Sequence, residues 1–225
     1  MSKFGEKSFK TLLTKSKLGV TIEKRTKGQV IETKNGESLE DLLKENSPEK
    51  IKAILNDKNT MSEILKFGYA LIVKEAQKQL DMKMRKREHS IPNESSVREV
   101  LKYLGNLDAF EREFGISFAN LIRDSINGNG YPYDLLTYVV LVVIQVASQM
   151  EKEWSQENKK IKNLNFGPEI VRLGLKLSNA KDHNTVKQIG GSALGIIIYS
   201  EAIRIDGGSG GAVPQLHKDN PTTFI

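Results

Sequence analysis

The sequence contains no cysteine among its 225 residues and only three histidines. The first absence excludes disulfide bonds, thiolate zinc sites and a cysteine nucleophile. The second leaves few ways to build a transition-metal site, because imidazole is the commonest metal ligand. We therefore expect no bound metal ion and no other cofactor.

Long apolar runs are missing as well. The most apolar run extends from Leu135 to Ala147, and Thr137 and Gln145 interrupt it. A helix that crosses a bilayer needs about 20 apolar residues. The N-terminus lacks the continuous apolar stretch of a secretory signal. These features predict a cytoplasmic protein without an integral membrane segment.

Motifs that support catalysis are scarce. The segment 190–195 has the glycine spacing of a phosphate-binding P-loop, but Ile196 replaces its lysine and Ile197 replaces its hydroxyl. Small residues that allow close helix packing explain this segment better. Asp182 and His183 lie at an expected helix start, which favours capping by Asp182 over catalysis. We therefore expect that the protein is not an enzyme.

The charge is unevenly distributed along the chain, whose formal net charge is +6. Residues 1–34 hold nine lysines and arginines against three glutamates, so this segment carries the whole excess. Residues 35–225 hold 25 basic and 25 acidic side chains. A basic segment joined to a neutral body suits attraction to nucleic acid or to an anionic lipid surface. The alternative is a solvated arm that keeps the protein soluble.

Hydrophobic spacing predicts a mainly α-helical protein with a two-lobed core and flexible terminal arms. Two β-prone runs around Gly28 predict a small N-terminal hairpin, and Pro92 disfavours helix at the residue before it. The expected divisions are a basic arm with the hairpin at 1–36, a helical N-terminal lobe at 37–91, a helical C-terminal lobe at 92–205 and a flexible tail at 206–225.

Capping signals mark the expected helix starts, since a short polar side chain satisfies the first backbone amides of a helix. The expected caps are Ser38, Ser47, Thr60, Ser95 or Ser96, and Asn106. A long helix from about Tyr133 into the 150s is apolar on every side at first, which is typical of a central core helix. Glu111 and Glu113 are interpreted as part of a solvated helix face.

A cationic cluster precedes the expected boundary at Pro92. It places four basic residues within five positions, 83–87, and helical spacing puts three of them on one face. Such a face could neutralise phosphates, although cations at a helix end also offset its macrodipole. Tyr131 and Tyr133 could stack on unpaired bases or simply pack their loop onto the core. The candidate nucleic-acid-binding residues are Lys24, Arg25, Lys27, Lys83, Arg85, Lys86, Arg87, Tyr131, Tyr133, Arg172 and Lys176.

Apolar residues near both ends of the chain suggest self-association. The first 18 residues carry Phe4, Phe9, Leu12 and Leu13, and the chain ends in Phe224 and Ile225 after a glycine-rich stretch. Such segments can dock on neighbouring copies and build chains or rings. The last three residues, 223–225, also fit a ligand for a sheet-edge recognition module.

Together these features predict sequence-nonspecific binding of single-stranded nucleic acid, with RNA as the expected partner, and self-assembly through the terminal arms. The layout is similar in general terms to that of small helical nucleocapsid proteins of RNA viruses, an analogy from architecture alone. A viral protein of this kind would occur in the virion as well as the cytoplasm. The alternative is a structural or protein-interaction subunit whose basic arm binds an acidic partner or a membrane surface.

Overall fold

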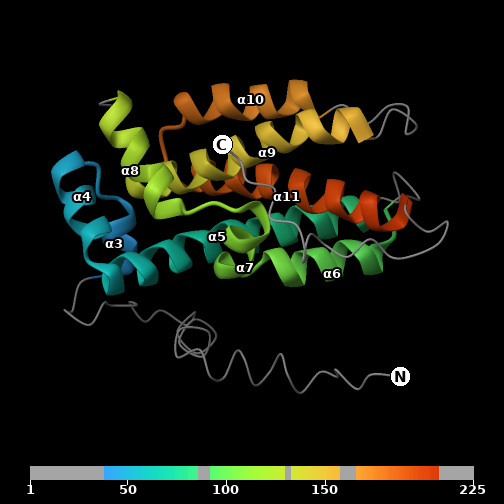
Figure 1. The fold of residues 1–225 in the computed structure, drawn as a ribbon, viewed down its shortest axis with the longest axis horizontal. Coiled ribbons are helices and arrows are strands. Elements are labelled where there is room, and N and C mark those ends of the chain that lie inside the picture. The colour runs from blue at the N-terminus through green and yellow to red at the C-terminus, as the bar shows by residue number, and fades with distance from the viewer. Residues whose placement is uncertain (1–37, 86–91, 130–132, 158–165, 208–225) are drawn as a thin grey trace, which may run out of the picture.

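The structure is a computed structural model that describes residues 38–85, 92–129, 133–157 and 166–207 (Figure 1). These residues form nine α-helices and no β-strand, which confirms the prediction of a mainly α-helical protein. The helices are α3 (Leu39–Leu43), α4 (Pro48–Asn56), α5 (Lys58–Arg85), α6 (Glu94–Leu104), α7 (Leu107–Phe114), α8 (Phe118–Asn129), α9 (Leu135–Glu157), α10 (Gly167–Ser178) and α11 (His183–Gly207). The predicted arm and hairpin and residues 208–225 of the predicted tail lie outside the described residues. Asp206 and Gly207, which were predicted to belong to the flexible tail, are the last residues of α11.

Three of the expected caps form as predicted. The side chains of Ser38, Ser47 and Asn106 accept hydrogen bonds from backbone amides of α3, α4 and α7. Gly115 ends α7 in the left-handed conformation, with φ of 61°. Glycine adopts this conformation without the steric penalty that a Cβ atom imposes.

Two predicted helix starts are wrong by a few residues. Helix α5 begins before Thr60, because Asp57 accepts hydrogen bonds from the amides of Asn59 and Thr60. Helix α6 is capped by Asn93, whose side chain accepts from the amide of Ser95. In both cases an Asp or Asn two or three residues earlier satisfies the amides first, and both residue types are strong caps.

Helices α5, α9 and α11 run side by side through the middle of the protein (Figure 1). Helix α11 packs against α5, α6, α9 and α10, so the last described segment contacts helices that precede and follow Pro92. The predicted division into two lobes is not confirmed. One continuous cluster of buried apolar side chains extends from Leu39 to Ala202 and includes residues from both sides of Pro92.

A polar bridge joins the end of α11 to the start of α6. One carboxylate oxygen of Asp206 accepts a hydrogen bond from the Ser96 hydroxyl at 2.5 Å, and the other accepts from the Asn93 amide. A carboxylate at this position also interacts favourably with the positive end of the α6 dipole. The residues that follow Pro92 are thereby held to α11.

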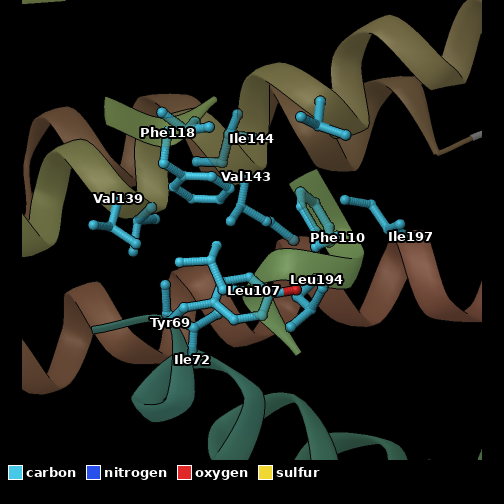
Figure 2. Packing of buried hydrophobic residues seen from close by; sticks show 14 of the residues in the cluster. Tyr69, Ile72, Leu107, Phe110, Phe118, Val139, Val143, Ile144, Leu194 and Ile197 are labelled. Atoms are coloured by element: carbon cyan, nitrogen blue, oxygen red, sulfur yellow. The ribbon is translucent and has the colours of Figure 1, made fainter. Parts of the chain in front are cut away.

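An aromatic cluster fills the core between α5, α7 and α8 (Figure 2). The ring of Tyr69 lies 5.4 Å from that of Phe110 and 5.8 Å from that of Phe118, in tilted and edge-on arrangements. The Tyr69 hydroxyl donates a hydrogen bond to the backbone carbonyl of Leu104 at 2.5 Å. Tyr69 therefore contributes both apolar burial and a polar contact that ties α5 to the end of α6.

Two glycines let α11 approach α5 closely, as their sequence suggested. A Cβ atom on Gly190 would lie 3.0 Å from Ile72 Cγ1 of α5 and 2.7 Å from Val140 Cγ2 of α9, and one on Gly191 would lie 2.9 Å from the backbone nitrogen of Ala76 in α5. Real Cβ atoms do not make such contacts, so any larger residue must displace the neighbouring helix.

The interpretation of Glu111 and Glu113 as solvated is wrong. The side chain of Glu113 is buried, and its Oε2 accepts a hydrogen bond from the Tyr103 hydroxyl at 3.1 Å. Burial raises the pKa of Glu111, whose Oε1 accepts from the Phe118 amide at 2.7 Å. Position 113 lies one turn beyond the buried Phe110, which places it on the core-facing side of α7.

Helix α9 forms a central part of the core. Within the described residues it contains the single window, Leu135–Lys152, that is long and apolar enough to cross a membrane by length and composition. Inside the protein, 67% of that window is buried. The same hydrophobicity is therefore used to pack α9 against its neighbouring helices.

Candidate functional site

The described residues form a groove of about 1030 Å³ that is lined by α5, α10 and the first half of α11. The turn between α10 and α11, residues 179–182, also lines it. Four basic side chains line it, from three separate segments of the chain. They are Lys78 of α5, Arg172 and Lys176 of α10, and Lys181 of the turn.

Two of these cations are paired with carboxylates of the same groove. The guanidinium of Arg172 lies 2.6 Å from a carboxylate oxygen of Glu169, and this interaction raises the pKa of Arg172. The ammonium of Lys78 lies 3.6 Å from Glu75. Exposed pairs of this kind are weak and exchange readily with other partners.

The other two cations have no such partner. Within the part of the chain that the structure describes, no carboxylate lies within 4.0 Å of the ammonium of Lys176 or Lys181. A third groove carboxylate, Asp182, is engaged by its own helix. Its two oxygens accept from the amide and the hydroxyl of Thr185, and these hydrogen bonds lower the pKa of Asp182. Lys176 and Lys181 are therefore available to an incoming anion.

Polar and apolar groups alternate on the rest of the groove surface. Ser192 donates a hydrogen bond to the side-chain oxygen of Gln79 at 2.8 Å, and the Gln79 amide donates to the carbonyl of Gln188 at 3.0 Å. Met82 and Leu175 are large apolar side chains that remain 48% and 63% exposed. The groove therefore offers cations, amides and apolar surface to one ligand.

The structure brings only two of the sequence-predicted residues into this groove, Arg172 and Lys176. Lys83 is exposed near the end of α5, but it does not line the groove. Tyr133 packs edge-on against Tyr138, with ring centroids 5.8 Å apart. This agrees with the alternative that Tyr133 packs its loop onto the core. The backbone of Arg85 belongs to α5, and nothing more is described of it. Lys24, Arg25, Lys27, Lys86, Arg87 and Tyr131 lie outside the described residues.

Sequence reasoning missed Lys78 and Lys181 as members of the site. Each stands in a region of mixed charge, so neither produces a distinct local signal. Almost 100 residues separate Lys78 from Arg172, and only the packing of both helices on α11 brings them to one groove. Covariation between such positions, or the structure itself, would reveal the pairing.

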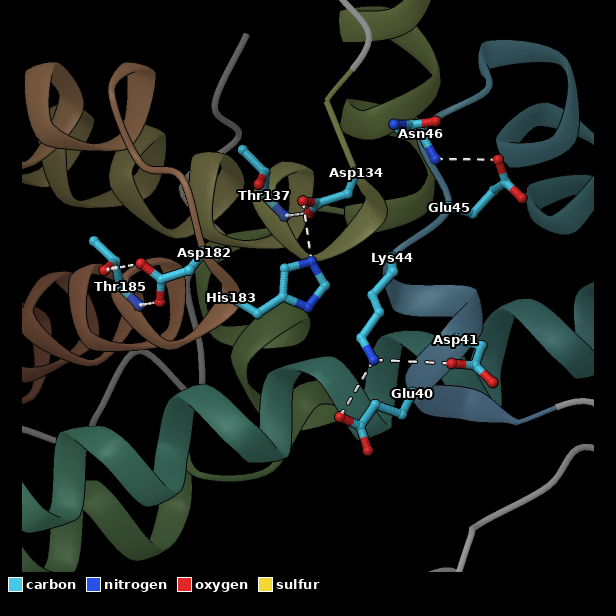
Figure 3. A network of polar contacts seen from close by, with 10 residues as sticks. All are labelled: Glu40, Asp41, Lys44, Glu45, Asn46, Asp134, Thr137, Asp182, His183 and Thr185. Atoms are coloured by element: carbon cyan, nitrogen blue, oxygen red, sulfur yellow. Dashed lines mark hydrogen bonds and ion pairs between the residues drawn. The ribbon is translucent and has the colours of Figure 1, made fainter.

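A second polar cluster lies where α9 and α11 begin (Figure 3). One oxygen of Asp134 accepts from the Thr137 amide at 2.7 Å, and the other lies 3.1 Å from Nε2 of His183. Asp182 caps α11 as predicted, whereas the contact between His183 and Asp134 was not foreseen. These contacts hold the starts of α9 and α11 together.

No group of three or more His, Asp or Glu side chains gathers closely enough to hold a metal ion in the described segments. Comparison with protein-family models, curated proteins and solved structures finds no match to this chain. The candidate site is therefore defined by its own geometry. It is a groove lined by four cations, by amide and hydroxyl side chains, and by two exposed apolar side chains.

Proposed function

We propose that this chain binds single-stranded nucleic acid, RNA above all, without sequence preference. One observation carries the proposal: Arg172 and Lys176, selected from the sequence, share a groove with Lys78 and Lys181. Cations from three segments that meet around one groove favour a ligand with repeated negative charges. A phosphodiester chain has that property.

The other groove residues support a sequence-independent mode of binding. The side-chain amide of Gln188, an exposed residue of the groove, can bond to phosphate or sugar oxygens, which carry no sequence information. Met82 and Leu175 can contact the apolar faces that all bases share.

The proposal predicts a specific loss of salt-dependent RNA binding. We expect the variant K78Q/R172Q/K176Q/K181Q to bind a fluorescent oligouridylate more weakly at low salt than the wild-type protein does. The slope of log affinity against log salt should fall by up to about 3, because each phosphate contact on a single strand contributes about 0.7. Fluorescence anisotropy across a salt series measures both quantities.

The matched control is K44Q/K50Q/K52Q/K58Q, which removes the same charge from exposed lysines at the α3 and α4 end. It should keep most of the affinity and the slope. Wild-type protein without affinity at low salt, or equal losses in both variants, would refute the proposal. A 260 to 280 nm absorbance ratio of bare protein, after purification without nuclease, would favour the protein-interaction alternative.

A further inference from the structure

In the two ion pairs of the groove, the carboxylates are less exposed to solvent than the cations. The side chains of Glu75 and Glu169 are 20% and 36% exposed, whereas those of Lys78 and Arg172 are 63% and 62% exposed. The carboxylates are thus recessed into the groove wall. The cations extend into solvent, where they can turn toward another partner.

Packing holds Glu75 in this recessed place. Its Cβ and Cγ occupy the space that a side chain on Gly191 would need, at 2.9 and 2.8 Å from the position of a Cβ atom there. The Gln79 amide also donates to its Oε1 at 3.5 Å. Glu75 therefore stays in the groove when Lys78 moves.

Glu169 is held in a different way, by two contacts with a single arginine. Its Oε1 accepts a hydrogen bond from Arg172 at 2.8 Å, and its Oε2 lies 2.6 Å from the same guanidinium nitrogen. A phosphate that binds Arg172 must either displace this carboxylate or share the guanidinium with it. Unlike a water molecule, the displaced carboxylate remains nearby and repels the phosphate.

We propose that Glu75 and Glu169 are built-in competitors of phosphate that limit the affinity of the groove for nucleic acid. The inference rests on the proposed function and adds a regulatory property to the same site. When the groove is empty, the two carboxylates neutralise Lys78 and Arg172. When a nucleic acid is bound, they repel it and speed its release.

The test is to neutralise each carboxylate and measure oligouridylate affinity by fluorescence anisotropy. We expect E169Q and E75Q each to bind about two- to fivefold more tightly than wild type at low salt, a range that matches the coupling of exposed ion pairs. The double variant should bind most tightly. The gains should shrink in 200 mM salt, because screening weakens exposed charges.

The matched control is E94Q, which removes a carboxylate that lies 2.6 Å from Arg98 in an exposed pair outside the groove. It makes the same change in net charge and should leave the affinity unchanged. Equal effects of E169Q and E94Q would overturn the inference, as would weaker binding by E169Q. If the wild-type protein binds RNA but E169Q does not bind more tightly, the proposed function stands and only the inference fails. If the wild-type protein does not bind RNA, the proposed function and the inference both fail. Circular dichroism establishes whether each variant is folded. If E75Q does not fold, the affinity of E169Q alone tests the inference.

Discussion

Replacing Tyr69 by alanine is expected to lower the free energy of unfolding by about 3 to 5 kcal/mol, the usual cost of removing a buried aromatic ring. The ring is fully buried and contacts Phe110 and Phe118 from a neighbouring part of the fold. Its loss leaves a cavity that these rings cannot fill without moving. Urea denaturation followed by circular dichroism measures the change.

The variant Tyr69→Phe separates the ring from the hydroxyl. It keeps the aromatic contacts and removes the hydrogen bond to the Leu104 carbonyl. A buried acceptor that loses its donor costs about 1 to 3 kcal/mol. If Tyr69→Ala were no more destabilising than Tyr69→Phe, the aromatic cluster would contribute little to stability.

Tyr69 also gives stability an alkaline dependence. Burial raises the pKa of its phenol well above the usual value of 10.0, so the folded state keeps the proton after the unfolded state has lost it. The contribution is complete below pH 10 and is lost as pH rises above it, because the unfolded state then binds fewer protons. In Tyr69→Phe, the fall in unfolding free energy above pH 10 should be shallower by up to about 1.4 kcal/mol per pH unit. Urea denaturation at several alkaline pH values tests this, and identical pH profiles for both proteins would contradict it.

Replacing Gly191 by alanine is expected to destabilise the protein by about 1 to 3 kcal/mol, the usual cost of overpacking a core. The added methyl group would lie 2.9 Å from the backbone nitrogen of Ala76 and 2.8 Å from Glu75 Cγ. The backbone of α5 cannot turn aside as a flexible side chain can. Helices α5 and α11 must therefore move apart, and thermal or urea denaturation will record the loss.

Gly195 provides the matched control within the same helix. Apart from its chain neighbours and the nearby backbone of α11 itself, no atom lies within 4 Å of the position that a Cβ atom would take there. Gly195→Ala should stabilise the protein by about 0.5 to 1 kcal/mol, because alanine loses less conformational freedom than glycine in a helix. The two substitutions are chemically identical and should have opposite signs. If both substitutions stabilised the protein, helix propensity and not the close contact of α5 and α11 would decide the outcome. If both destabilised it, the prediction for Gly195 would be wrong.

Local rules predicted most of the helices. Caps at Ser38, Ser47 and Asn106, and the left-handed glycine at position 115, depend on contacts within four residues, so the sequence nearby contains the necessary information. The same rules placed the predicted starts of α5 and α6 a few residues too late, because Asp57 and Asn93 act as the caps. The errors are small because the competing groups are also local.

The interpretation of Pro92 as a boundary between lobes relied on the local backbone preference of a proline. Whether two lobes form depends instead on how distant helices pack. Helices α5 and α6 precede and follow Pro92 in the chain, but Asp206 and the packing of α11 on α5 and α6 hold both sides together. Glu113 illustrates the same limit on a smaller scale. Its charge suggested exposure, whereas the face of α7 on which it lies is covered by the core.

From the sequence alone came the helical class, the absence of thiol chemistry, the uneven charge and the cations of α10. Each is a matter of composition or of spacing within a few residues. The tertiary structure alone decided that Lys78 and Lys181 join Arg172 and Lys176, and that Glu75 and Glu169 are recessed beside them. The physical reason is that α5 and α10 are far apart in the chain and meet across α11, where two glycines permit a helix contact that no local pattern specifies.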